Sequence, residues 1–445
     1  MRKNKIKSAI ILSSICISIF HFSCNNSKKE VSTKKEESSI SSQNTEWINA
    51  LIMAYRALTN NRNIAAADLL LEATDLMPKK NWENYFVCAT IYAPKGENDK
   101  AFLSIQKAIE AGLKDVELLN SVSEFSLLRN DSRWKDLINS TNNKRKAYLN
   151  SINNPQLLEE LENMWKEDQF ALSKYEENIK SLDTNASVQE YRMLFKPVKD
   201  RWNINKDKLD SIINIHGWPG YKLVGEDGAK ISWAIPQHHP NIFFKEKCLI
   251  LIAKSIENKD TDPNHYAELK DRIARETWQK QTFGASMGEG MPYPIEDPAN
   301  VDNRRIALGL LEPVEIYAYY HGIKYQRPSI EVAKTEMKTI YDKAQKNYTN
   351  FEYFITKKNA DSANVYINKG IKFHGDISNS QLYKAAIKLA QTDNKRSHQI
   401  SLKIIKVLIW RKWEKRFEIL NQIGFSSLHD KQEWIKIKEL LEKSK

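Results

Sequence analysis

The sequence predicts an all-α fold, or one nearly so, in which helical hairpins flank a mostly helical central domain. Apolar residues recur with a period near 3.6 in segment after segment, and one hairpin pattern repeats at an offset of 35 residues. The chain has 445 residues, too many for one typical core, which suggests two to four domains. With 41% hydrophobic and 28% charged residues, global disorder and a polytopic membrane protein are excluded.

The first 23 residues carry the pattern of a secretory signal peptide. Basic residues precede an apolar run of 16 residues, Ser8 to Ser23, which is shorter than the roughly 20 residues of a membrane span. The small residue before Cys24 resembles the lipobox of bacterial lipoproteins, so we expect residues 1–23 to be removed and Cys24 to be lipidated. His21 and Phe22 depart from the usual lead-in, and a plain signal peptide or an uncleaved anchor is the alternative.

Residues 24–45 are rich in Ser, Lys and Glu and predict a flexible tether. We therefore expect an exported, membrane-anchored lipoprotein that faces the periplasm or the cell surface, held to the membrane by the lipid on Cys24. Of the other cysteines, Cys16 lies in the signal peptide, while Cys88 and Cys248 lie in apolar helical patterns typical of buried packing residues. No disulfide scaffold, metal site or cofactor is expected.

Residues 46–142 contain a repeated pattern of small and large apolar residues. Its positions are Ala54, Ala57, Ala66, Leu70, Ala73 and Pro78, and then, 35 residues after the first five, Ala89, Tyr92, Ala101, Ile105 and Ala108. Small residues are needed where the two helices of a hairpin cross closely, and the spacing is near a unit of about 34 residues. The segment resembles two tetratricopeptide repeats with a capping helix, which implies a groove for a protein or peptide partner. Generic helical hairpins are the alternative.

A second similarity links the two ends of the chain. An apolar loop that begins at Phe125 precedes a helix with Trp134, and the same arrangement recurs 300 residues later with Phe425 and Trp434. Such an aromatic end-cap closes the last hairpin of a helical repeat group, so residues 330–445 are predicted to form a second, basic helical repeat-like domain. Its predicted helices span residues 332–346, 380–391 and 397–420. The last is basic and amphipathic, so it could lie on anionic lipid, although packing of its apolar face in a core is the interpretation we favour.

The net charge of +12 is concentrated at the C-terminal end, where residues 321–445 hold 25 Lys and Arg against 13 Asp and Glu. A polyanion or an anionic membrane would therefore meet that end of the protein. A nucleic-acid partner is not expected, because the sequence has no nucleic-acid recognition motif and an exported protein would rarely meet nucleic acid.

The central segment, residues 155–320, carries the most specific pattern. Its elements in order are His216-Gly217-Trp218-Pro219, Trp233, Gln237-His238, Asp271-Arg272, Gln281-Thr282-Phe283-Gly284, Pro294-Ile295-Glu296-Asp297 and Arg304-Arg305 before Gly309-Leu310. Their order and spacing resemble the bacterial domain of unknown function 6624. The resemblance implies a mostly helical domain, often in secreted proteins or lipoproteins, without an established activity. His239 and Ala285 depart from it, because the family usually has a small residue and a threonine at these places.

The candidate catalytic residues within this pattern are histidines and carboxylates, which supply general acids and bases: His238, His216, Asp271 and Glu296. The candidate ligand-binding residues offer charged or amide groups, or a flexible turn beside them: Arg272, Gln281, Gly284, Asp297, Arg304 and Arg305.

Each candidate also has a structural alternative. Asp271 and Arg272 could anchor neighbouring loops, the carboxylates near Glu296 could cap the following helix, and His216 could cap a helix C-terminus. The adjacent His238 and His239 would point about 100° apart on a helix, which argues against a metal site.

Two functions follow from these patterns. The leading hypothesis is a membrane-anchored binding or scaffolding module whose repeats hold a protein or peptide and whose central domain binds a ligand. The alternative is a hydrolase or transferase that uses a cleft of histidine, carboxylate and arginine side chains in the central domain. The sequence has no Gly-rich phosphate loop, Gly-x-Ser-x-Gly, His-Glu-x-x-His or Cys-x-x-Cys motif that would decide whether the protein is an enzyme.

Overall fold

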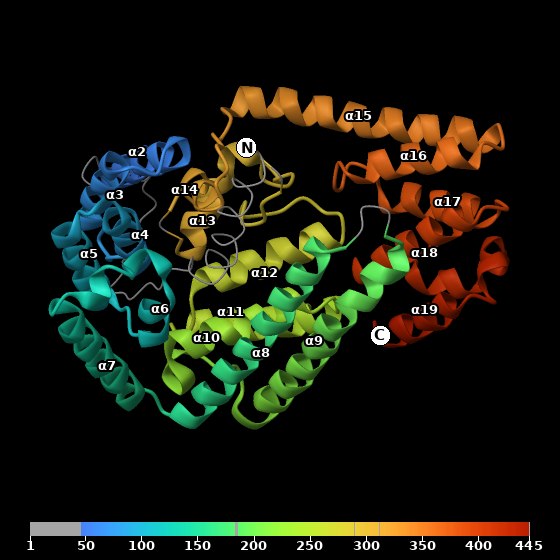
Figure 1. The fold of residues 1–445 in the computed structure, drawn as a ribbon. Coiled ribbons are helices and arrows are strands. Elements are labelled where there is room, and N and C mark those ends of the chain that lie inside the picture. Colours follow the sequence, from blue (N-terminus) through green and yellow to red (C-terminus); the bar gives the residue numbers. More distant parts are fainter. Residues whose placement is uncertain (1–45, 183–185, 289, 311, 445) are drawn as a thin grey trace, which may run out of the picture.

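The computed structural model describes residues 46–182, 186–288, 290–310 and 312–444. The predicted signal peptide, the predicted lipidation site Cys24 and the predicted tether lie outside these residues. The described part of the chain is built from α-helices and short 3-10 turns and contains no β-strand, so the prediction of an all-α fold is confirmed (Figure 1). None of the described helices is both long and apolar enough to cross a membrane.

The N-terminal module consists of two successive hairpins and a capping region. Its helices are α2 (Glu46–Asn60), α3 (Ile64–Leu76), α4 (Trp82–Tyr92), α5 (Asn98–Ala111), α6 (Val116–Ser121) and α7 (Arg133–Ser151). Asn63 and Asn81 begin α3 and α4, because each side chain accepts a backbone N–H of the first turn. Most alanines of the repeated pattern are buried, at Ala54, Ala66, Ala73, Ala89, Ala101 and Ala108, whereas Ala57 is partly buried.

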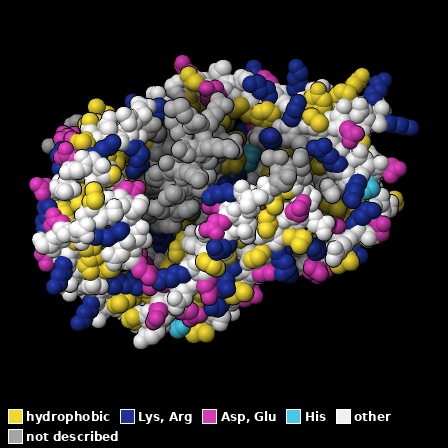
Figure 2. All heavy atoms as spheres, in the orientation of Figure 1, with side chains coloured by type: hydrophobic (Ala, Val, Ile, Leu, Met, Phe, Trp, Pro, Cys, Tyr) yellow, Lys and Arg dark blue, Asp and Glu magenta, His cyan; other side chains and the backbone are white. Residues whose placement is uncertain are grey.

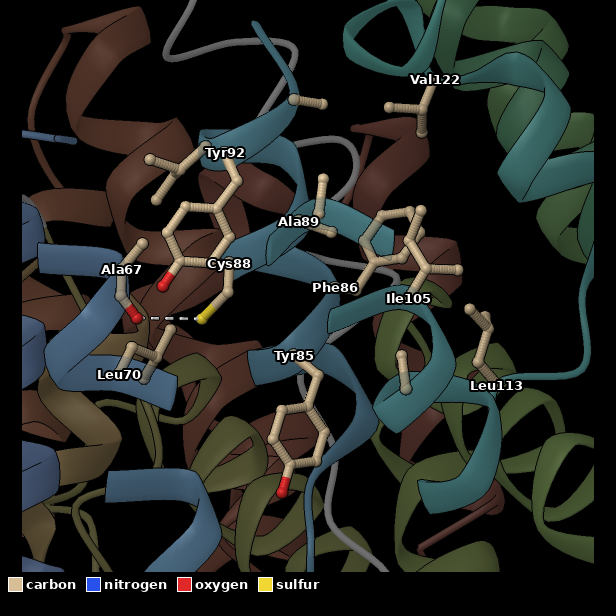
Figure 3. Packing of buried hydrophobic residues seen from close by; sticks show 14 of the residues in the cluster. Ala67, Leu70, Tyr85, Phe86, Cys88, Ala89, Tyr92, Ile105, Leu113 and Val122 are labelled. Atoms are coloured by element: carbon tan, nitrogen blue, oxygen red, sulfur yellow. Dashed lines mark hydrogen bonds between the residues drawn. The ribbon is translucent and has the colours of Figure 1, made fainter. Parts of the chain in front are cut away.

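The core of this module is continuous from α2 to α7. Figure 3 shows Tyr85, Phe86 and Tyr92 of α4 projecting among aliphatic residues of the neighbouring helices. Cys88 is fully buried in the same core, and its thiol donates a hydrogen bond to the carbonyl oxygen of Ala67 at 3.3 Å. The prediction that Cys88 and Cys248 are buried packing residues is confirmed.

The central domain begins with two long antiparallel helices on which the others pack. Its helices are α8 (Pro155–Lys180), α9 (Val188–His216), α10 (Tyr221–His238), α11 (Ile242–Glu257), α12 (Pro263–Glu276), α13 (Val301–Leu308) and α14 (Val314–Tyr320). Helix α10 packs against both α8 and α9. Gly217 ends α9 with a positive φ of 76°, a conformation that glycine adopts without side-chain strain.

Helix α10 is bent at Gly225, which has a φ of 70°, and it continues through Pro236 to His238. A side chain at position 225 would be excluded, because its Cβ would lie 2.1 Å from the hydroxyl oxygen of Tyr148. That hydroxyl accepts the N–H of Asp227, which lies just beyond the bend, at 3.0 Å. The bend therefore brings the start of α10 against the end of the N-terminal module.

Helix α14 joins the central domain to the N-terminal module. Its residues Ile316, Tyr319 and Tyr320 belong to the same buried cluster as the helices of the N-terminal module. The ring of Tyr320 packs edge-on against Tyr55 with centroids 4.9 Å apart, and Nε of Arg56 donates to the hydroxyl of Tyr319 at 2.7 Å. The last helix of the central domain thus packs against α2, the first described helix of the chain.

The C-terminal module contains α15 (Ile330–Thr356), α16 (Ala360–Ile371), α17 (Asn379–Ala390), α18 (Lys395–Trp410) and α19 (Gln432–Glu442). Helix α15 is longer than predicted, and α16 was not predicted. Helix α18 ends ten residues earlier than predicted, because Lys412 takes a left-handed φ of 52° and Arg411 donates to the carbonyls of Thr277 and Trp278. The apolar face of α18 is buried, which supports the packing interpretation over the lipid interpretation.

The two predicted end-caps have similar packing. The ring centroids are 5.9 Å apart for Phe125 and Trp134, and 5.8 Å apart for Phe425 and Trp434. In both modules the phenylalanine sits in a short 3-10 turn and the tryptophan lies near the start of the following helix.

Candidate functional site

The carboxylate of Asp271 fastens the loop that follows α12. Asp271 is fully buried, and its two oxygens accept the backbone N–H groups of Thr282 at 2.7 Å, Phe283 at 3.0 Å and Ala285 at 2.8 Å. Burial raises the pKa of Asp271 to about 6, while the N–H donors act in the opposite direction. A carboxylate held in this way stabilises the loop and presents no free oxygen to a ligand.

Gln281 holds the same loop from within. Its amide nitrogen donates to the carbonyls of Ser286 at 3.0 Å and Tyr293 at 2.6 Å, and its amide oxygen accepts the N–H of Ser286 at 2.7 Å. Gly284 has a φ of +68°, and a Cβ there would lie 2.6 Å from Val314. Gln281 and Gly284 therefore both stabilise the conformation of this loop.

Two arginines of α13 complete this framework. Arg304 donates to the carbonyls of Thr282 at 2.8 Å and of Glu296 and Asp297 at 3.0 Å each. Arg305, which is 1% exposed, donates to the carbonyls of Phe283 at 3.1 Å and Glu312 at 2.8 Å. We call Asp271, Gln281, Arg304 and Arg305 the loop framework. These four residues of the sequence pattern between 271 and 305 therefore hold the backbone of the loop.

The remaining candidates of this region lie outside the loop framework. Arg272 donates to Glu276, four residues on, at 2.6 Å. Glu296 is exposed. Asp297 takes a left-handed φ of 51°, and its carboxylate accepts the side-chain amide of Asn300 at 2.9 Å.

The two candidate histidines are far apart. His216 is exposed at the C-terminal end of α9, whereas the ring of His238 packs against Trp202, with centroids 5.9 Å apart. Trp202 lies 14 residues before His216 on the same helix, a separation of about 20 Å at 1.5 Å per residue. A single active site cannot use both imidazoles.

His238 occupies the seam between α8, α9 and α10. Its ring is stacked on Trp165 with a centroid distance of 5.7 Å, and its Nδ1 lies 2.9 Å from Oδ2 of Asp168. This distance is short enough for an ion pair, but the orientation of the ring does not allow a hydrogen bond between the two atoms. Asp168 is 3% exposed and also faces the amide of Asn205 at 3.4 Å.

His239, the departure from the family pattern, is a buried and neutral residue. Its Nδ1 accepts the N–H of Asn241 and its Nε2 faces the amide oxygen of Asn203, both at 3.1 Å. Burial and the nearby lysines Lys206 and Lys245 lower the pKa of His239 to about 4. Among the described residues, no three His, Cys, Asp or Glu side chains are grouped as metal ligands would be.

The structure brings together a set of ionisable residues that the sequence did not indicate. We call it the junction cluster, because it lies where α4 of the N-terminal module meets the central domain: Glu83, Lys230, Asp262, Glu268 and Glu312. Glu83, Asp262 and Glu268 are buried, and Lys230 and Glu312 are partly buried. The charge of Lys230 acts on both Glu83 and Glu268, although they belong to different modules.

The environment of the junction cluster shifts each pKa in the direction that favours the neutral form of the side chain. Burial raises the pKa of Glu83 and Glu268 to about 8 and that of Asp262 and Glu312 to about 7. Burial also lowers the pKa of Lys230.

Tyrosines of α14 complete the polar contacts. Tyr317 donates to Glu268 at 2.8 Å and Tyr320 donates to Glu312 at 2.6 Å. The junction cluster is therefore a desolvated group of acids and a base whose surroundings favour their neutral forms.

Fold and site together define an all-helical protein with a polar cluster between its first two parts. Residues 165–325 match the model of a family of unknown function, DUF6624. The match falls on the predicted central domain and confirms that resemblance for about a third of the chain. Comparisons with curated proteins and with solved structures gave no match.

Proposed function

We propose that the protein is a membrane-anchored lipoprotein that acts as a binding and scaffolding module. In this proposal Cys24 carries the lipid, tetratricopeptide-like repeats in residues 46–142 hold a protein or peptide partner, and the central domain binds a small polar ligand at the junction cluster. The observation that carries the ligand site is the burial of Glu83 and Glu268, together with the partly buried Lys230 whose charge acts on both, at the meeting of two modules.

Burying an ionisable group costs free energy, because the group loses its hydration. Such groups are therefore buried mainly where they bind or react. Ionisable residues with displaced pKa values cluster at functional sites, although structural networks produce them too. The junction cluster draws on α4, α10, α12 and the segment before α14. A ligand there would contact both modules and so fix their arrangement, as expected of a scaffold.

The loop framework favours a structural role over chemistry for the sequence pattern itself. Asp271, Gln281 and Arg305 direct their polar atoms to backbone groups of the protein. The repeats are supported by the burial of the small residues where each pair of helices crosses, as close tetratricopeptide packing would require.

The ligand site is tested by thermal unfolding of the full chain against a library of small polar compounds. A ligand raises Tm of the native state by mass action, and we expect the increase to disappear in Glu83→Gln and Glu268→Gln. Glu159→Gln, an exposed position on α8, is the matched control and should respond like the wild type. A library without any hit, or hits that the two cluster variants retain, would argue against the site.

The anchor is tested by metabolic labelling of the full chain with a radioactive fatty acid. Label on the wild type and its loss in Cys24→Ser would support lipidation. Equal labelling of both chains would remove Cys24 from the proposal.

The second candidate is a hydrolase or transferase centred on His238, and it is favoured by one observation. A carboxylate lies beside an imidazole there: Oδ2 of Asp168 is 2.9 Å from Nδ1 of His238, and a small rotation of the ring would align a hydrogen bond that orients the imidazole as a general base. Turnover of model ester, phosphoester or glycoside substrates that is lost in His238→Gln, with Tm unchanged, would establish it. Turnover that persists in His238→Gln would eliminate it.

A further inference from the structure

A groove runs along the surface between α8 and α9, apart from the junction cluster. Its cavity volume is about 720 Å³, and the residues that line it from α8 extend from Lys166 to Asn178. At 1.5 Å per residue this segment is about 18 Å long. The volume lies within the range of small-molecule sites, roughly 300–1,000 Å³.

The floor of the groove is apolar and reaches solvent. Phe170, Tyr175, Leu194 and Pro197 contribute to the lining, and Phe170 is 65% exposed. On the same hairpin Met193 is 67% exposed. Met193 lies outside the lining, but apolar side chains gathered near one groove indicate a binding surface more strongly than scattered ones do. Figure 2 shows hydrophobic and charged side chains side by side on the band of surface formed by α8 and α9.

The charged side chains of the lining are mainly basic. Lys166, Lys174 and Arg201 face a single acid, Glu167, which pairs with Arg201 at 2.5 Å. The two lysines pair with Glu117 and Glu177 outside the lining, at 3.3 and 2.9 Å. Those glutamates are 82% and 58% exposed, and such exposed pairs contribute little to stability. Both lysines thus remain able to meet an anion.

We propose that the α8–α9 groove binds one molecule of a long-chain carboxylate, with the alkyl chain along Phe170, Leu194 and Pro197 and the carboxylate among the basic residues. Removing the methylenes of the alkyl chain from water is favourable, so the apolar floor supplies most of the affinity. The basic rim selects the anionic head. The site lies on α8 and α9, away from α4 and α12, so it is separate from the ligand of the proposed function.

The probe for the test is 11-(dansylamino)undecanoic acid, used below its critical micelle concentration with the full Cys24→Ser chain. We expect saturable binding at one site, displaced by palmitate and at least tenfold less readily by hexadecanol. Phe170→Asp and the double variant Lys174→Glu/Arg201→Glu should each weaken binding at least tenfold. Because these positions are exposed or partly exposed, folding should be intact, which far-UV circular dichroism and Tm would verify.

Two control variants match these changes outside the groove. Lys196→Glu alters a 72% exposed lysine of α9 that does not line the groove, and Met53→Asp alters a 60% exposed methionine of α2. Both should bind the probe like the wild type. Equal displacement by palmitate and hexadecanol, or unchanged binding in the groove variants, would overturn the proposal.

Discussion

The side chain of Asp271 shows how one buried carboxylate can organise a whole loop. Three backbone N–H groups between residues 282 and 285 converge on its two oxygens. Without the carboxylate these donors would be buried without partners, at a cost of about 1–3 kcal/mol for each group left unpaired. The residue is adjacent in sequence to Arg272, whose side chain instead reaches along its own helix to Glu276.

Asp271→Asn is therefore expected to destabilise the protein by about 2–4 kcal/mol, since the amide turns an NH₂ group toward a backbone donor. Urea unfolding of the full chain measures the change. Glu296→Gln, on an exposed side chain, should shift the free energy of unfolding by no more than about 0.5 kcal/mol. Equal effects of the two substitutions would contradict the structural role of Asp271.

The pKa of Glu268 predicts a dependence of stability on pH. Burial raises this pKa from 4.5 to about 8, so the folded chain keeps a proton that the unfolded chain releases above pH 4.5. The stabilisation from this group is complete below pH 4.5 and is lost as pH rises through 8, with a slope of up to about 1.4 kcal/mol per pH unit. Glu268→Gln keeps the acceptor for Tyr317 but removes the titration. The difference in unfolding free energy between variant and wild type, measured from pH 5 to 8.5, should grow in favour of the variant; a flat difference would refute the assignment.

At the scale of elements, the bend in α10 depends on a glycine. Gly225 combines a φ of +70° with contact to Tyr148, whereas Gly96 has a φ of +78° and open space around its Cβ position. Gly96→Ala should cost about 1 kcal/mol for the backbone strain alone. Gly225→Ala should cost clearly more, because Tyr148 must also move. Thermal unfolding of the two variants compares them directly, and equal losses would show that the contact with Tyr148 is unimportant.

Periodicity predicted most helices, but their ends depend on contacts that are distant in sequence. The apolar spacing of α18 continues to Trp413 and Phe417, and only the hydrogen bonds of Arg411 to Thr277 and Trp278 show why the helix stops. The end of α9, in contrast, has a local signal, because Gly217 takes the positive φ and Pro219 follows two residues later.

The candidate site was harder to predict than the helices. Glu83, Lys230 and Glu268 come from separate helices, and no local spacing relates them. Glu83 is an acidic residue in the first turn of α4, a position where such residues are commonly exposed. Only the packing of α4 against the central domain shows that it is buried. The sequence did identify Asp271 and the two arginines, but their chemistry suggested a ligand where the structure has backbone carbonyls and N–H groups.

For the whole molecule, α14 makes the first two parts interdependent. Ile316, Tyr319 and Tyr320 are 0%, 6% and 7% exposed because α2 and its neighbours cover them. Residues 155–320 expressed alone would present these side chains to water. We expect this fragment to unfold at a lower temperature than residues 46–327 and to bind more of the dye ANS than the longer fragment does. Equal Tm values for both fragments would mean that the contact with α2 contributes little.

The two buried cysteines lie in different cores, Cys88 among the helices of the N-terminal module and Cys248 among those of the central domain. Both side chains are fully buried, and burial raises the pKa of each thiol. Since the thiolate is the reactive form, neither cysteine should be alkylated while its core remains closed. The rate of alkylation at each position then measures how often the surrounding core opens. One sample of the natural chain, digested and analysed by mass spectrometry, would give both opening rates without any introduced label.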